Sequence, residues 1–129
     1  MKNKLSSLFL SSIAASFILL APALHAADGT WNVDVNGLWS TNANWLSSTI
    51  ANGSNSIASF TNDITANRTV SLDTDRTINR VNFGDSDISS AGSWILDNNG
   101  DTNNNLILSG TTGAASGTVP VIDVGALGR

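Results

Sequence analysis

Two short apolar runs in the second half of the chain decide its fold. They read WILD at residues 94–97 and LILSG at residues 106–110, and the polar stretch NNGDTNNN at 98–105 separates them. Brief β-prone runs divided by Asn, Asp, Gly and Ser are typical of β-strands joined by turns. Because the chain after residue 27 repeats this pattern, the sequence predicts an all-β protein.

The spacing of the runs suggests two architectures. The centres of the runs lie near Phe60, Val70, Val81, Ile95, Ile107 and Ile122. A right-handed parallel β-helix, or solenoid, suits this spacing because each coil contributes short strands to parallel sheets. An antiparallel β-sandwich suits it as well. The chain closes on a strand-like run and a loop without a polar capping element, which favours the solenoid and the first coils of a longer repeat protein.

One run departs from strand periodicity. Val81 and Phe83 alternate as strand residues do, whereas Ile78 falls out of their register. This mismatch predicts a bend or bulge within residues 77–83.

The N-terminal residues predict export. A short basic segment, an apolar run over 5–20 and small residues over 21–27 are typical of a secretory signal peptide, here residues 1–26. Serines interrupt the apolar run, which is shorter than the roughly 20 residues of a transmembrane helix. We therefore expect no membrane span after cleavage, and a single β-rich domain over 27–129 that is secreted or displayed at the cell surface.

The composition of residues 27–129 excludes several functions. They contain ten Asp and four Arg but no Lys, His, Glu or Cys. An acidic chain of this kind lacks the basic surface that binds nucleic acid. Catalytic nucleophiles that depend on His or Cys are excluded. The nearest carboxylate pairs, Asp73 with Asp75 and Asp85 with Asp87, lie in turn-like segments where Asp usually bonds backbone. We expect no enzymatic activity.

Three tryptophans are candidate ligand-binding residues. Trp39 and Trp45 are six residues apart, which puts both on one face if the segment is extended. Together with Trp31 they either pack inward or form an exposed platform that stacks on polysaccharide. The large apolar area of indole rings favours the inward arrangement.

The segment between the runs at 94–97 and 106–110 is a candidate cation site. Oxygen-bearing side chains alternate at Asp97, Asn99, Asp101 and Asn103, and hard cations such as calcium take oxygen ligands. The pattern departs from the EF-hand because Thr102 and Leu108 replace the expected Gly and Glu. An Asn/Asp-rich turn is the simpler interpretation, and calcium remains the one candidate cofactor.

Several stretches carry a family resemblance. They are GLWSTNANW at 37–45, ITANRTV at 64–70, VNFGD at 81–85 and the runs at 94–97 and 106–110. Together they resemble the amino-terminal region of bacterial autotransporter-associated β-strand repeat proteins. The resemblance implies a β-helical passenger with a structural or adhesive role at the cell surface. The alternative function is a carbohydrate-binding β-sandwich module that uses exposed Trp, and an exposed solenoid end is a candidate for edge-to-edge self-association.

The signal peptide gives the first testable prediction. Cleavage after Ala26 fits the small-residue pattern best, so N-terminal sequencing of the exported protein should start near Ala27 or Asp28. An exported protein that retains Met1 would contradict this assignment.

Overall fold

The fold is described from a computed structural model, which covers residues 26–87, 89–90, 92–110 and 120–125. Its regular elements are mostly short strands, accompanied by two 3-10 turns of three residues each. The predicted all-β class is confirmed. The predicted signal peptide lies outside these residues except for Ala26, and so do the last residues of the chain, 126–129.

The elements follow one another at short intervals. In chain order they are β1 (Gly29–Thr30), β2 (Gly37–Leu38), η1 (Asn42–Asn44), η2 (Leu46–Ser48), β3 (Ile57–Phe60), β4 (Arg68–Ser71), β5 (Arg76–Ile78), β6 (Arg80–Phe83), β7 (Trp94–Asp97), β8 (Leu106–Leu108) and β9 (Val121–Val124).

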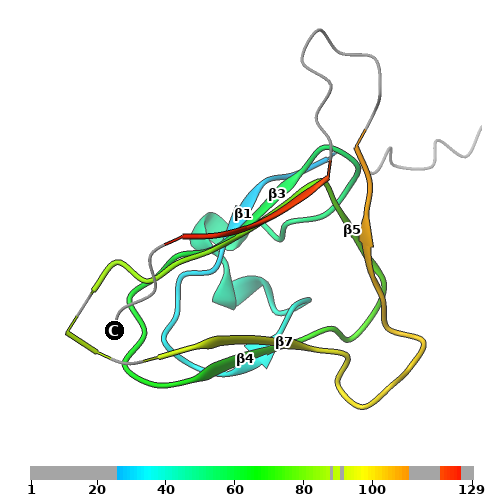
Figure 1. The fold of residues 1–129 in the computed structure, drawn as a ribbon. Coiled ribbons are helices and arrows are strands. Elements are labelled where there is room, and N and C mark those ends of the chain that lie inside the picture. The colour runs from blue at the N-terminus through cyan, green and yellow to red at the C-terminus, as the bar shows by residue number, and fades with distance from the viewer. Residues whose placement is uncertain (1–25, 88, 91, 111–119, 126–129) are drawn as a thin grey trace, which may run out of the picture.

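The strands form three separate sheets. Their orders are β1-β3-β6-β9, β2-β4-β7 and β5-β8. All pairings between these strands are parallel. Figure 1 shows the sheets as the three sides of a triangle, with β1 and β3 on one side, β4 and β7 on the second and β5 on the third.

The runs at 94–97 and 106–110 lie in different sheets. β7 pairs with β4 and β8 pairs with β5, so each run adds to a strand that occurs earlier in the chain. The polar residues 98–105 between them form the corner that joins two sides of the triangle (Figure 1). The strand pattern that the sequence predicts is therefore correct, while the partner of each strand is distant in sequence.

The predicted bend near Ile78 is confirmed and is a corner between two sheets. β5 ends at Ile78 and β6 begins at Arg80 in another sheet, with Asn79 between them. The Asn79 amide donates to the carbonyl of Ser56 at 2.9 Å, which fixes the turn. Ile78 and Val81 are both fully buried although they fall out of register, because each points inward from its own side of the triangle.

The core is apolar and centred on Phe60. Its ring lies 5.3 to 6.1 Å, between centroids, from five other aromatic rings, those of Trp31, Trp39, Trp45, Phe83 and Trp94. Buried aliphatic side chains such as Val70, Ile78 and Val81 complete the cluster. Burial of this apolar area is the main favourable term in the stability of a chain without disulfides.

Removing the central ring should therefore destabilise the fold strongly. We expect Phe60→Ala to lower the free energy of unfolding by about 3–5 kcal/mol, because the cavity and the lost apolar burial add. Urea denaturation measures this change. The matched control Ile107→Ala removes a side chain that is 43% exposed and should change stability by less than about 1 kcal/mol. Equal effects of the two substitutions would contradict this description of the core.

Candidate functional site

The three candidate tryptophans gather around Phe60 inside the molecule. Trp31 and Trp39 are fully buried, and Trp45 is 2% exposed. The centroids of Trp31 and Trp45 are 5.4 Å apart in an edge-on arrangement, and those of Trp39 and Trp45 are 5.1 Å apart. A sugar-stacking platform needs an accessible ring face, so this placement favours the inward interpretation over the exposed platform.

The indole N–H groups also bond inside the molecule. Trp39 Nε1 donates to the carbonyl of Ala51 at 2.9 Å, and Trp45 Nε1 donates to the carbonyl of Trp39 at 2.7 Å. A buried indole usually finds such a partner. Trp31 Nε1 is the exception, because it is buried and has no hydrogen-bond partner within the described residues.

The segment between Trp39 and Trp45 is not extended, so the condition for placing both rings on one strand face is not met. β2 ends at Leu38, and the chain then turns through η1 and η2 on either side of Trp45. The amide of Asn32 donates to the carbonyl of Asn44 at 2.8 Å, which draws this segment back over Trp31. The two rings meet because the segment folds over the core, and not because a strand period aligns them.

The candidate calcium segment lies at the exposed corner between β7 and β8. Asp97 Oδ1 accepts the amide of Asn99 at 3.0 Å, and Asp101 Oδ1 accepts both the amide and the side-chain Nδ2 of Asn103 at 2.9 Å. These are turns closed by an Asp side chain. Among the residues that the structure covers, no cluster of three or more acidic, His or Cys side chains could hold a metal ion. Calcium binding here stays a prediction.

A network that the sequence did not predict joins neighbouring turns of the chain. Side-chain oxygens of Asn and Asp accept backbone amides that lie one turn further along. The acceptor and donor residues are Asp28 with Ile57, Asp34 with Thr65, Asn36 with Thr69, Asn52 with Thr77, Asn67 with Ser93 and Asp75 with Asn105, at distances of 2.8 to 3.3 Å. These bonds satisfy corner amides that the strand ladders do not reach.

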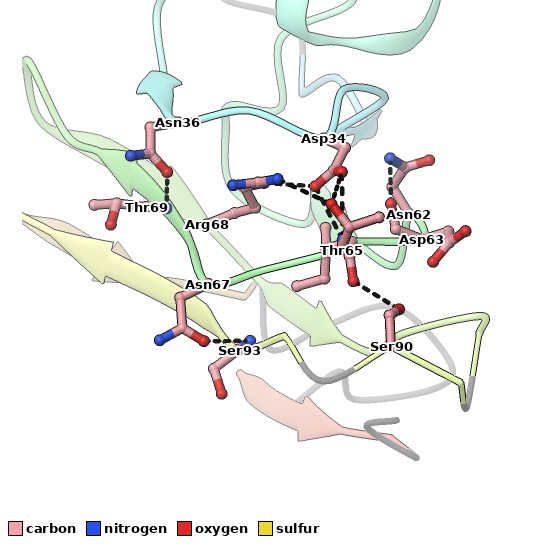
Figure 2. A network of polar contacts seen from close by, with 11 residues as sticks. Asp34, Asn36, Asn62, Asp63, Thr65, Asn67, Arg68, Thr69, Ser90 and Ser93 are labelled. Carbon is pink, nitrogen blue, oxygen red and sulfur yellow. Dashed lines mark hydrogen bonds and ion pairs between the residues drawn. The ribbon is translucent and has the colours of Figure 1, made fainter. Parts of the chain in front are cut away.

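Asp34 makes the most contacts in this network (Figure 2). Its carboxylate accepts the amide of Thr65 at 3.3 Å, the hydroxyl of Thr65 at 2.7 Å and Nε of Arg68 at 2.5 Å. The bond from Arg68, followed by those from Thr65, holds the pKa of Asp34 well below its usual value of 3.8. Asp34 therefore remains ionised in the folded protein under acidic conditions that protonate ordinary carboxyls.

A second group of carboxylates lies nearby. Reduced hydration raises the pKa of Asp63, and the negative charges of Asp87 and Asp85 raise it further. Asp85 Oδ1 accepts the amide of Asp87 at 3.1 Å, so this pair closes a turn as its sequence context predicts. Asp75 of the other candidate pair is bonded to Asn105. Both pairs thus have structural partners.

Comparisons with known proteins give no relative. No family model matches the chain, and neither the curated proteins nor the solved structures contain a match. In the portion of the chain covered here, none of the helices has the length and apolar character required to cross a membrane.

The Asp34 contacts predict a particular pH dependence of stability. Because the pKa of Asp34 is lower in the folded than in the unfolded state, its charge stabilises the protein above pH 3.8 and this contribution is lost as the pH falls further. Asp34→Asn should lower the urea midpoint at neutral pH, and the difference from the wild type should narrow below pH 3.8. Asp28→Asn is the comparison, since Asp28 accepts one amide and no arginine. A difference that stays constant down to strongly acidic pH would contradict the assignment.

Proposed function

We propose that this chain is a secreted or surface-exposed structural and adhesive segment without catalytic activity, built as a right-handed parallel β-helix. The observation that carries the proposal is the set of three sheets with parallel pairing throughout. Strands β3, β4 and β5 visit the three sheets in turn, and β6 then returns to the sheet of β3. One such circuit is a coil of a solenoid, and parallel crossovers of this kind are almost always right-handed.

The pairing pattern weighs against the antiparallel β-sandwich. In a sandwich, strands that follow one another often pair directly through hairpins. Here the consecutive strands β3, β4 and β5 belong to different sheets, and each pairs with a strand from a neighbouring circuit. The carbohydrate-binding alternative loses support as well, because the candidate tryptophans are buried.

The inward-facing residues form columns that continue to the last described strands. Val81 is fully buried and pairs with Ile122, which is 55% exposed. Ile78 is fully buried and pairs with Leu108, which is 38% exposed. Apolar side chains that occupy core positions of the register, yet lie open to solvent, fit the underside of a further β layer.

The two ends of the described stack differ. At the β1 and β2 end, the segment that holds η1 and η2 covers the aromatic rings, and Trp31 and Trp39 are completely buried. At the β7, β8 and β9 end, these strands are the last of their sheets among the described residues, and apolar side chains such as Ile122 and Val124 are exposed. Unpaired strand edges recruit other strands, so we propose that this open end is where the segment extends or associates.

Export and a surface role rest on the sequence. The predicted signal peptide, the acidic lysine-free composition after it and the resemblance to autotransporter-associated repeat proteins support a location outside the cytoplasm. Adhesion and polysaccharide contact belong to this proposal as roles of the outer surface of the solenoid.

A charged substitution at the open end, in β8, tests the proposal. Sedimentation velocity of the full chain over a range of concentrations should reveal self-association of the wild type. Leu108→Asp should weaken it about tenfold or more, because burying an unpaired carboxylate costs well above the ~1.4 kcal/mol that corresponds to tenfold.

The control for this experiment is Ile95→Asp. Ile95 is 43% exposed, similar to Leu108, but it pairs with the partly exposed Thr69 on the outer face of the sheet. The Ile95→Asp substitution should leave association unchanged, and circular dichroism checks that both variants fold. A wild type that stays monomeric, or equal effects of the two substitutions, would contradict the proposed role of the open end.

A further inference from the structure

The chain contains three Asn-Gly dipeptides, at Asn36, Asn52 and Asn99. We propose that Asn99 is a site of spontaneous modification in the folded protein, where it deamidates to aspartate and isoaspartate, and that the inter-turn hydrogen bonds protect Asn36 and Asn52. This inference concerns covalent chemistry of the β7–β8 corner and is independent of the proposed function.

The reaction needs only water. The backbone nitrogen of Gly100 loses its proton to solvent base and attacks Cγ of Asn99, forming an N–Cγ bond. The Cγ–Nδ2 bond breaks and the amide leaves as ammonia, which carries away a proton from solvent. The resulting succinimide then takes up one water at either ring carbonyl. Opening on one side gives aspartate, and opening on the other gives isoaspartate, whose backbone runs through the former side chain.

Few contacts restrain Asn99 from reaching the conformation that this attack requires. Asn99 and Gly100 are both exposed, and a Cβ atom built at Gly100 would have no atom within 4 Å beyond those of its chain neighbours. The side chain of Asn99 makes no hydrogen bond to the described residues, so its Cγ is free to approach the neighbouring amide. Both residues have positive φ, 56° for Asn99 and 75° for Gly100.

The attacking nitrogen is held only within the turn itself. The Gly100 amide donates to Oδ1 of Asn98 at 3.1 Å, an exposed bond between residues of the same loop. Water can replace such a bond readily, because residues 98–103 are all exposed. Because β7 and β8 pair with β4 and β5, we expect both strands to stay paired when the turn rearranges.

Asn52 is fixed in every group that would have to move. Its Oδ1 accepts the amide of Thr77 at 3.2 Å, and the amide of Gly53 donates to the carbonyl of Thr77 at 2.6 Å. Its own backbone exchanges two hydrogen bonds with Ala27, at 2.9 and 3.1 Å. The nucleophile and the electrophile are therefore both engaged with other turns of the chain.

Asn36 is tied to the neighbouring turn through its side chain and the strand that follows it. Its Oδ1 accepts the amide of Thr69 at 2.9 Å, and Gly37 is part of β2, in register with Val70 of β4. A Cβ atom built at Gly37 would lie 2.4 Å from Nδ2 of Asn44, so the side chain of Asn44 packs closely against Gly37. Attack by the Gly37 nitrogen would require the first turn of the chain to open.

Deamidation would change the charge of this corner. It creates a carboxylate at position 99, between Asp97 and Asp101, in an already acidic protein. The isoaspartate product also adds a carbon to the backbone of the turn. Because the turn is exposed and its flanking strands pair with earlier strands, we expect the change to stay local.

The test compares the three sites in one sample. The full chain is aged at mildly alkaline pH, both folded and in concentrated urea, and is then digested at mildly acidic pH. Peptide mass spectrometry measures replacement of the amide NH2 by OH, and chromatography separates aspartate from isoaspartate. In the folded chain Asn99 should convert at least about tenfold faster than Asn36 and Asn52. This ratio corresponds to a free energy of ~1.4 kcal/mol for local opening at Asn36 and Asn52. In urea all three should convert at similar rates.

Gly100→Ala supplies the matched control. The added methyl group hinders the attacking nitrogen and meets no atom outside its chain neighbours, although the positive φ of Gly100, 75°, strains an alanine there. Conversion at Asn99 should slow, while unchanged rates at Asn36 and Asn52 show that the strain stays within the turn. The Asn99→Asp variant provides the charge standard for ion-exchange chromatography of the aged protein. Equal rates at the three sites in the folded chain, or an Asn99 that converts in urea but not in the folded chain, would overturn the proposal.

Discussion

The structure depends on the pairing of backbone amides at its corners. Strand ladders satisfy the amides along each side of the triangle, but the chain must also turn between sides, where no ladder continues. Asn and Asp side chains accept these corner amides from the following turn, as Asp34 does for Thr65 and Asn67 for Ser93. A chain without disulfides is thereby fixed by a core inside and a series of polar bridges around it.

Core and corner positions need different residue types, which explains the composition of the chain. Aromatic and aliphatic residues are concentrated at inward positions such as Phe60 and Val81, which carry the apolar burial. Many of the Asn and Asp side chains that give the sequence its polar character bond backbone amides, as Asn36, Asn52 and Asp75 do. Such side chains commonly hydrogen-bond backbone groups at turns, and here they reach the adjacent turn as well.

The sequence predicted the strands well and their partners poorly. Runs such as 94–97 and 106–108 carry a local period that residue type alone reveals, and even the corner after Ile78 left a mismatch in that period. Parallel pairing joins residues far apart, such as Val70 with Leu96, and nothing local specifies which strand will be the neighbour. The apolar area of the indole rings correctly favoured an inward position for Trp39 and Trp45. The path of the chain between them was not predictable, because tertiary contacts set that turn. The Asp34 network escaped prediction because its partners lie one circuit away, and circuits differ in length.

The number of residues between paired strands varies, and this variation bears on where the fold accepts insertions. Ala58 pairs with Val81 across a much shorter stretch of chain than Val81 pairs with Ile122, yet both pairings keep the same inward column. Residues gained or lost at a corner therefore leave the register of the strands unchanged. Such a framework can accept extra residues at its corners without a change in the packing of its interior.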